Sequence, residues 1–193
     1  MQRSILFVFV VLCILGTGSG MSSLGAAENT QALEVITNNY AARNFAPGAV
    51  NKADLDRILA AGVRAPSAGN RQPWRFTVVQ NQALAKRIVP NISDGNVLII
   101  ISAAGDGKTN GSVILDCALA TESIYLAAQA LGLGSRIYTG PMDTVNSQLK
   151  AELGLPNDYS AVALVRIGQV APGTDAVSSA SGRKSPDSVV TYK

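Results

Sequence analysis

Histidine is absent from this sequence. Because histidine is the usual general base near neutral pH, its absence excludes a Ser-His-Asp triad, a Cys-His pair and a His-Glu-x-x-His zinc site. Hydrolytic and zinc-dependent chemistry are therefore disfavoured, and we expect no metal site. What remains is chemistry supplied by a cofactor, or a binding role without chemistry.

Cysteine is nearly absent as well. Cys13 lies in an apolar run near the N-terminus, and Cys117 lies in an apolar segment with helical character. A lone Cys117 in the mature chain cannot form an intrachain disulfide, and two thiols cannot build a structural zinc site. We interpret Cys117 as a core residue rather than a reactive thiol.

Charge is sparse and evenly spread. Charged residues make up 15% of the 193 positions and the formal net charge is +3, with no run of five like charges. Nucleic-acid binding requires a basic stripe that this sequence lacks, so we expect no nucleic-acid partner. Hydrophobic residues make up 47%, which is enough for one globular domain with a sizeable core.

The N-terminus has the features of a processing segment. Arg3 precedes an apolar run over residues 5–15, which is shorter than the ~20 residues that span a bilayer. Small residues at 25–27 favour cleavage before Glu28. We therefore expect a signal peptide at 1–27, a folded domain at 28–193, a periplasmic or secreted protein, and membrane contact only through an uncleaved signal. Translation from Met21 stays open as an alternative and would leave a cytoplasmic protein.

Hydrophobic periodicity predicts alternating helices and strands. Two features locate helix ends: Asn51 opens the second helix and is followed by Asp54, and Asp143 caps a later helix. The helix from 116 to 131 is apolar almost all round, as in a buried central helix. These elements predict an α/β sandwich in one layered domain. The expected helices cover residues 30–38, 51 to Pro66, 83–88, 116–131 and 143–153, and the expected strands cover 76–80, 97–102, 136–139 and 161–167.

The most specific motif is residues 65–76, which read APSAGNRQPWRF. Pro66 halts a helix, and the small residues after it leave an open loop with free N–H groups. A planar ring can approach such a backbone closely, while Ser67 and Asn70 can meet its polar edge. The block resembles the A-P-S-x-x-N-x-Q-P-W-x-F block of the FMN-dependent nitroreductase family at every fixed position.

Three further segments resemble the same family. Residues 116–135 are similar to its central helix and the Gly-Leu-Gly exit, and Thr139-Gly140 follows at the family spacing. Residues 161–168 resemble the last core strand. In the tail, family members place a basic residue before a proline and a Val-Val pair, where it holds the FMN phosphate; Arg183 and Lys184 are both candidates for that role.

One segment departs from the family pattern. The family reads R-R-S-x-R-x-F near the start of the domain, whereas residues 39–45 read NYAARNF and keep only Arg43 and Phe45. Asn39 brings no charge to a phosphate and Ala41 brings no hydroxyl. We therefore expect FMN binding that is either weakened or compensated by Arg183 and Lys184.

The resemblance implies an α/β (α+β) nitroreductase-like fold with a central, mostly antiparallel sheet flanked by helices. It also implies a homodimer whose C-terminal tail lies on the partner, with the FMN site between subunits. The protein then holds and tunes the flavin, and no side chain is catalytic. The implied FMN-binding residues are Asn39, Ala41, Arg43, Pro66, Ser67, Ala68, Asn70, Gln72, Thr139, Gly140, Arg183 and Lys184.

The expected function is transfer of two electrons from NAD(P)H to a nitroaromatic, quinone or similar small acceptor. An exported flavin-binding module with reduced or lost reductase activity is the alternative. The altered segment 39–41 favours it, and so does the scarcity of NAD(P)H outside the cytoplasm. A different flavin reaction, such as oxidation of a bound group or flavin fragmentation, is a third possibility.

Overall fold

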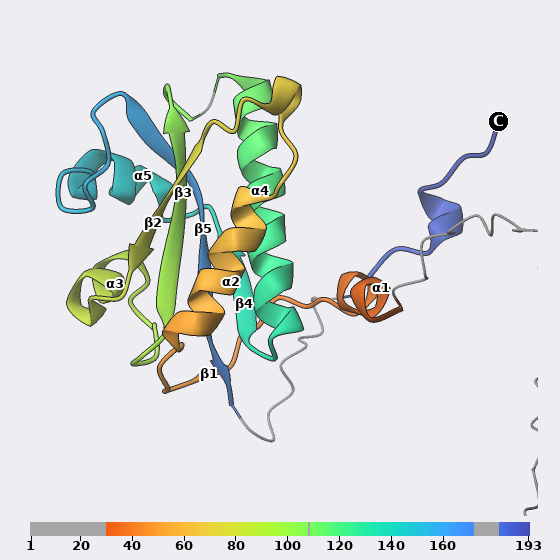
Figure 1. The fold of residues 1–193 in the computed structure, drawn as a ribbon, viewed down its shortest axis with the longest axis horizontal. Coiled ribbons are helices and arrows are strands. Elements are labelled where there is room, and N and C mark those ends of the chain that lie inside the picture. The colour runs from red at the N-terminus through yellow and green to blue at the C-terminus, as the bar shows by residue number, and fades with distance from the viewer. Residues whose placement is uncertain (1–29, 108, 172–181) are drawn as a thin grey trace, which may run out of the picture.

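The computed structural model describes residues 30–107, 109–171 and 182–193, so the expected signal peptide at 1–27 lies outside the described residues. Helices and strands alternate along the chain (Figure 1). The helices are α1 (Thr30–Thr37), α2 (Lys52–Val63), α3 (Gln82–Ile88), α4 (Gly111–Ala130) and α5 (Met142–Thr144). The strands are β1 (Phe45–Ala46), β2 (Trp74–Val79), β3 (Val97–Ala104), β4 (Gly134–Tyr138) and β5 (Tyr159–Val170). Short helical turns are η1 (Ala68–Asn70), η2 (Val145–Leu149) and η4 (Pro186–Ser188).

The five strands form one antiparallel sheet in the order β1-β5-β3-β2, with β4 also paired to β5. Strand β5 connects the sheet, because it pairs with three other strands. Strand β3 pairs along most of its length, while β4 and β1 pair toward its C-terminal end. This arrangement confirms the expected mostly antiparallel sheet flanked by helices.

The sheet is covered on both faces, which gives three layers. Along β3, Ile99 and Ile101 face the core formed with α2 and α4, and Leu98 and Ile100 face the core formed with α3, α5 and η2. Successive side chains of a strand point to opposite faces. A strand buried on both faces therefore reads as the continuous apolar run seen at residues 97–101.

The long helix α4 differs in two ways from the expectation. It begins at Gly111 rather than Asp116, because the Asn110 side chain accepts a hydrogen bond from the Val113 N–H at 3.3 Å and caps it. It is also not buried all round, since Leu115 is 59% exposed and Leu119 is 36% exposed. One apolar face of α4 therefore lies open on this chain.

The expected cap at Asn51 is confirmed, because its side chain accepts a hydrogen bond from the Asp54 N–H at 2.8 Å. The expected cap at Asp143 is wrong. The chain enters α5 directly from Pro141, and Asp143 lies within the first turn. Proline suits a helix start, since its fixed φ is already helical.

Candidate functional site

Most of the motif, residues 66–73, forms a largely exposed loop between α2 and β2, while Ala65 is buried and residues 74–76 begin β2. Gly69, Asn70 and Gln72 all have positive φ, at 58°, 55° and 48°. Positive φ is uncommon for residues other than glycine, and each such residue stores strain of order 1–3 kcal/mol that the surrounding structure must hold. Residues in this state cluster at functional sites, so the loop is the foremost candidate.

Hydrogen bonds within the loop fix its shape. Ser67 Oγ accepts a hydrogen bond from the Gln72 N–H at 3.0 Å, and Gln72 Nε2 donates to Asn70 Oδ1 at 3.1 Å. A cavity of about 330 Å³ opens beside them, lined by Val63, Arg64, Ala65, Pro66, Asn70 and Gln72. A Cβ added at Gly69 would meet nothing within 4 Å. The space next to this backbone is therefore open to a ligand or to a second subunit.

Two hydrogen bonds anchor the loop to the N-terminal half of α4. The Ala68 N–H donates to Asp116 Oδ1 at 2.9 Å, and Arg71 Nη2 donates to Ser112 Oγ at 2.9 Å. Sequence reasoning gave the helix no role in the site and so missed Asp116. The available signal was a carboxylate flanked by apolar residues in a mostly apolar helix, because a fully buried acidic residue is rare unless it has a partner.

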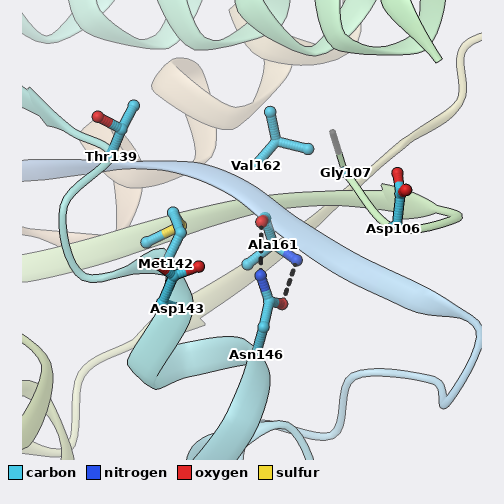
Figure 2. Close-up of a pocket in the computed structure, with 8 residues that line it drawn as sticks. All are labelled: Asp106, Gly107, Thr139, Met142, Asp143, Asn146, Ala161 and Val162. Atoms are coloured by element: carbon cyan, nitrogen blue, oxygen red, sulfur yellow. Dashed lines mark hydrogen bonds between the residues drawn. The ribbon is translucent and has the colours of Figure 1, made fainter. Parts of the chain in front are cut away.

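Thr139 and Gly140 lie at the end of β4, on a turn closed by the Met142 N–H donating to the Thr139 carbonyl at 3.1 Å. Both are exposed, and a Cβ added at Gly140 would meet nothing within 4 Å. Thr139 lines a second cavity of about 280 Å³ with Asp106, Gly107, Met142, Asp143, Asn146, Ala161 and Val162 (Figure 2).

Asn146 shapes the floor of that second cavity. Its side-chain Nδ2 donates to the Ala161 carbonyl at 3.0 Å and its Oδ1 accepts from the Ala161 N–H at 2.7 Å (Figure 2). The β3–β5 register shifts here, because Ser102 pairs with Ala161 while Ile101 pairs with Ala163. The amide thus satisfies both backbone groups of a residue at a β-bulge.

The segment 39–43 is held against the C-terminal half of α4. Gln129 bonds both backbone groups of Tyr40, at 3.1 Å each. The Asn39 side chain donates to the Ile36 carbonyl at the end of α1, and the Tyr125 hydroxyl donates to its Oδ1 at 3.5 Å. Ala41 is half-buried and Arg43 is exposed. A phosphate contact by Asn39 remains a prediction. The amide group of its side chain is already hydrogen-bonded to the Ile36 carbonyl at the end of α1.

Arg183 and Lys184 are exposed in the C-terminal segment. Figure 1 shows this segment and α1 on the same side of the molecule, away from α3 and α5. Burial raises the pKa of Tyr125, and the positive charge of Arg183 acts in the opposite direction. Arg183 therefore lies within electrostatic reach of the residue that contacts Asn39.

The predicted residues form separate groups on one chain. The loop at 66–72 meets α4 at Asp116, whereas Asn39 meets α4 at Tyr125, which is about 14 Å further along the helix at 1.5 Å per residue. The two cavities have no lining residue in common.

Known proteins resemble this chain in sequence and in fold. A protein of Archaeoglobus fulgidus provisionally named NADH dehydrogenase/NAD(P)H nitroreductase is 32% identical over 148 residues, covering 72% of this chain and 84% of the relative. A Desulfovibrio desulfuricans protein, provisionally named a nitroreductase and solved in complex with FMN, has a TM-score of 0.70 at 25% identity, covering 86% of this chain and 98% of its own.

A nitroreductase of Desulfitobacterium hafniense with bound FMN has a TM-score of 0.68 at 26% identity, covering 84% of this chain and 98% of its own. The sequence profile of the nitroreductase family matches residues 36–99 and 89–169. Since the profile takes in the loop at 66–72, the segment at 39–43 and the turn at 139–140, this chain belongs to the nitroreductase family.

Proposed function

We propose that this protein is an FMN-dependent oxidoreductase that passes two electrons from NAD(P)H to a nitroaromatic, quinone or similar small acceptor. The observation that carries the proposal is the loop at 66–72, which is exposed and strained and has open space beside its backbone. The two FMN-bound relatives described above, of 25% and 26% identity, support the same cofactor.

The residues present suit a flavin. Polar groups of Ser67, Asn70 and Gln72 gather on one short loop, and the backbone at Gly69 and Gly140 leaves room that a side chain would fill. Arg43, Arg183 and Lys184 are exposed cations for the phosphate. When bound, the flavin supplies hydride acceptance and two-electron transfer. The chain's own residues hold the ring, orient it and tune it, and no side chain serves as a nucleophile or a general base.

The proposed assembly is a homodimer with one FMN per subunit. The supporting observation is the open face of α4, where Leu115 and Leu119 are exposed, together with Val189, Val190 and Tyr192 exposed in the C-terminal segment. Exposed apolar patches mark interaction surfaces. A second copy of the chain covering α4 would bring a loop at 66–72 from one subunit to the basic residues of the other.

Two measurements on the purified protein test the function. The first is the visible absorbance of oxidised flavin, which decides whether FMN is bound. The second is NAD(P)H oxidation in the presence of a nitroaromatic or a quinone. A colourless protein that takes up no added FMN refutes the proposal, and a yellow protein that never oxidises NAD(P)H refutes the reductase activity.

An exported flavin-binding module with reduced or lost reductase activity is the second candidate. Asn39 favours it, because its side-chain amide donates to the Ile36 carbonyl at a position where the family pattern carries an arginine. The module is expected to bind FMN and to show no turnover with either nicotinamide cofactor.

We also propose export, with residues 1–27 removed and the mature chain starting at Glu28. The apolar run at 5–15 and the small residues at 25–27 support this. Mass spectrometry of the protein from its native host gives the N-terminus. A cytoplasmic protein that begins at Met21 would overturn the proposal.

A further inference from the structure

We propose that Asp116 is the positioning residue of the flavin site, holding the loop at 66–72 in its strained shape before any ligand arrives. The inference rests on the proposed function for its flavin, and on this structure for the anchor. Asp116 does not touch the proposed ligand in this argument. It acts through the backbone of Ala68.

Asp116 is an unusual residue for its place in the fold. It is 1% exposed, in the second turn of a helix that packs against α2 and the sheet. Its Oδ1 accepts the Ala68 N–H, while its Oδ2 is buried and has no hydrogen-bond partner in the part of the chain that the structure describes. Burying a carboxylate that is only partly satisfied destabilises a fold. Core packing alone therefore does not explain an aspartate at this position.

The nearest cation offsets the burial only in part, through a long ion pair. Arg71 Nη2 lies 3.8 Å from Asp116 Oδ2, which is too far for a hydrogen bond, and the Arg71 side chain is 52% exposed. The same guanidinium donates to Ser112 Oγ and, through Nε, to the Ala68 carbonyl at 3.1 Å. Asp116, Arg71 and Ser112 thus form one set of contacts that ties the loop to α4.

The hydrogen bond between Ala68 and Asp116 lies at the start of the strained part of the loop. Ala68 opens the turn η1, and Gly69 and the strained residues Asn70 and Gln72 follow it. Strained backbone persists only where its surroundings hold it. A charge-assisted hydrogen bond from the Ala68 N–H, at the first residue of the turn, to the buried carboxylate of Asp116 supplies that restraint. A site ordered in advance binds more tightly, because ordering is not required at the moment of binding.

Asp116→Leu is the most informative substitution. Leucine has a similar volume, and an apolar replacement of a buried, poorly paired charge is often neutral or stabilising. The melting temperature of Asp116→Leu should therefore stay the same or rise, while the loop at 66–72 becomes more mobile. Loss of flavin binding without loss of stability is a result that a purely structural aspartate cannot produce. Asp94→Leu, on an exposed aspartate paired with Lys86, is the matched control.

The rate of trypsin cleavage measures how readily the loop at 66–72 opens, and this measurement does not depend on flavin binding. Arg71 lies in the loop, whereas Arg75 lies in β2 opposite Ser102 and serves as an internal reference. We expect cleavage after Arg71 to become at least about tenfold faster in Asp116→Leu, with cleavage after Arg75 unchanged. Asp116→Asn keeps an acceptor oxygen for the Ala68 N–H and should restore near-wild-type cleavage. Asp116→Ala should behave like the leucine variant, and it replaces that variant if leucine does not fold.

Flavin affinity is measured from the fluorescence of flavin released when the purified full-length protein is diluted. We expect Asp116→Leu to weaken binding of FMN and of riboflavin by the same factor, at least about tenfold, because the loop serves the ring rather than the phosphate. Unchanged cleavage and affinity would overturn the proposal. Faster cleavage with unchanged affinity would also overturn it, since Asp116 would then hold the loop at 66–72 without contributing to flavin binding. Wild-type protein without flavin affinity would refute the proposed function, and cleavage would then decide the anchor alone.

Discussion

The guanidinium of Arg166 lies over the ring of Phe45, with its central carbon 4.0 Å from the ring centroid. Arg166 is 3% exposed and donates to Asn96 Oδ1 at 2.9 Å and to Ser93 Oγ at 3.1 Å. This buried cation, on β5, joins β1 to the loop before β3. The same guanidinium also donates to the Asn91 carbonyl at 3.3 Å. It thus meets four neutral partners at once, which the single ammonium of a lysine cannot do.

Arg166→Lys should therefore lower the free energy of unfolding by roughly 3 kcal/mol, because it leaves buried polar partners unsatisfied. Urea unfolding measures the change. Arg57→Lys, on an arginine that is 69% exposed in α2, should change it by less than about 0.5 kcal/mol. Equal effects at the two positions would show that the Arg166 network contributes nothing to stability.

Leu115→Glu should break the proposed dimer. A carboxylate placed on the open apolar face of α4 must lose its hydration when that face is covered, so the assembly should shift to monomers at micromolar concentration and release FMN. Light scattering on a sizing column gives the mass. Ala83→Glu adds the same charge on the exposed surface of α3 and should leave the mass unchanged. A wild-type monomer that holds stoichiometric FMN would contradict the shared site.

Arg183→Ala combined with Lys184→Ala should weaken FMN binding at least about tenfold, because two candidate phosphate contacts are lost. Riboflavin, which has no phosphate, should bind the double variant as it binds wild type. A fluorescence titration at fixed salt compares the two ligands. If FMN affinity is unchanged, both residues are solvated charges and the phosphate depends on Arg43 or on other groups.

The thiol of Cys117 should be inert in the folded protein. Burial, followed by the negative charge of Asp116, raises the pKa of Cys117 to about 11. At pH 8 only about one thiol in a thousand is then ionised, and its 0% exposure blocks reagents as well. In the chain from Glu28 onward, which lacks Cys13, a disulfide-exchange reagent at pH 8 should label Cys117 only after denaturant is added. Rapid labelling of the native protein would show that α4 opens locally.

Local rules predicted most of the fold. The cap at Asn51 and the apolar run of β3 each depend on neighbours close in sequence, and both were found where expected. The α4 start failed because residues 109–112 read as a loop, while the cap comes from Asn110. The expected helix at 143–153 is present as α5 and the helical turn η2, over residues 142–149, and only its expected cap at Asp143 was wrong, because the helix starts from Pro141.

The candidate site likewise has one part that local sequence patterns predict and one part that they do not. The block at 65–76 identifies its loop, because the residues needed for small size, turns and polar contacts are contiguous. A carboxylate in a mostly apolar helix marks Asp116 as unusual, but the sequence does not identify its partner, because the contact joins residues 48 positions apart through one backbone amide. Asn39 was read as a weakened phosphate ligand, and its bond to the end of α1 became visible only once α1 was in place.

The position of β5 at the end of the folded body has a consequence for biosynthesis. Among the described residues, β5 is the last strand in chain order. The helices and the β2–β3 pair are therefore synthesised before the strand that joins β3, β4 and β1. Contacts between distant parts of a chain form late. The sheet of the nascent polypeptide thus stays incomplete until β5 has emerged. Under the export proposed above, a translocation machinery that threads unfolded chains would receive such a substrate, and the flavin would be acquired on the far side of the membrane.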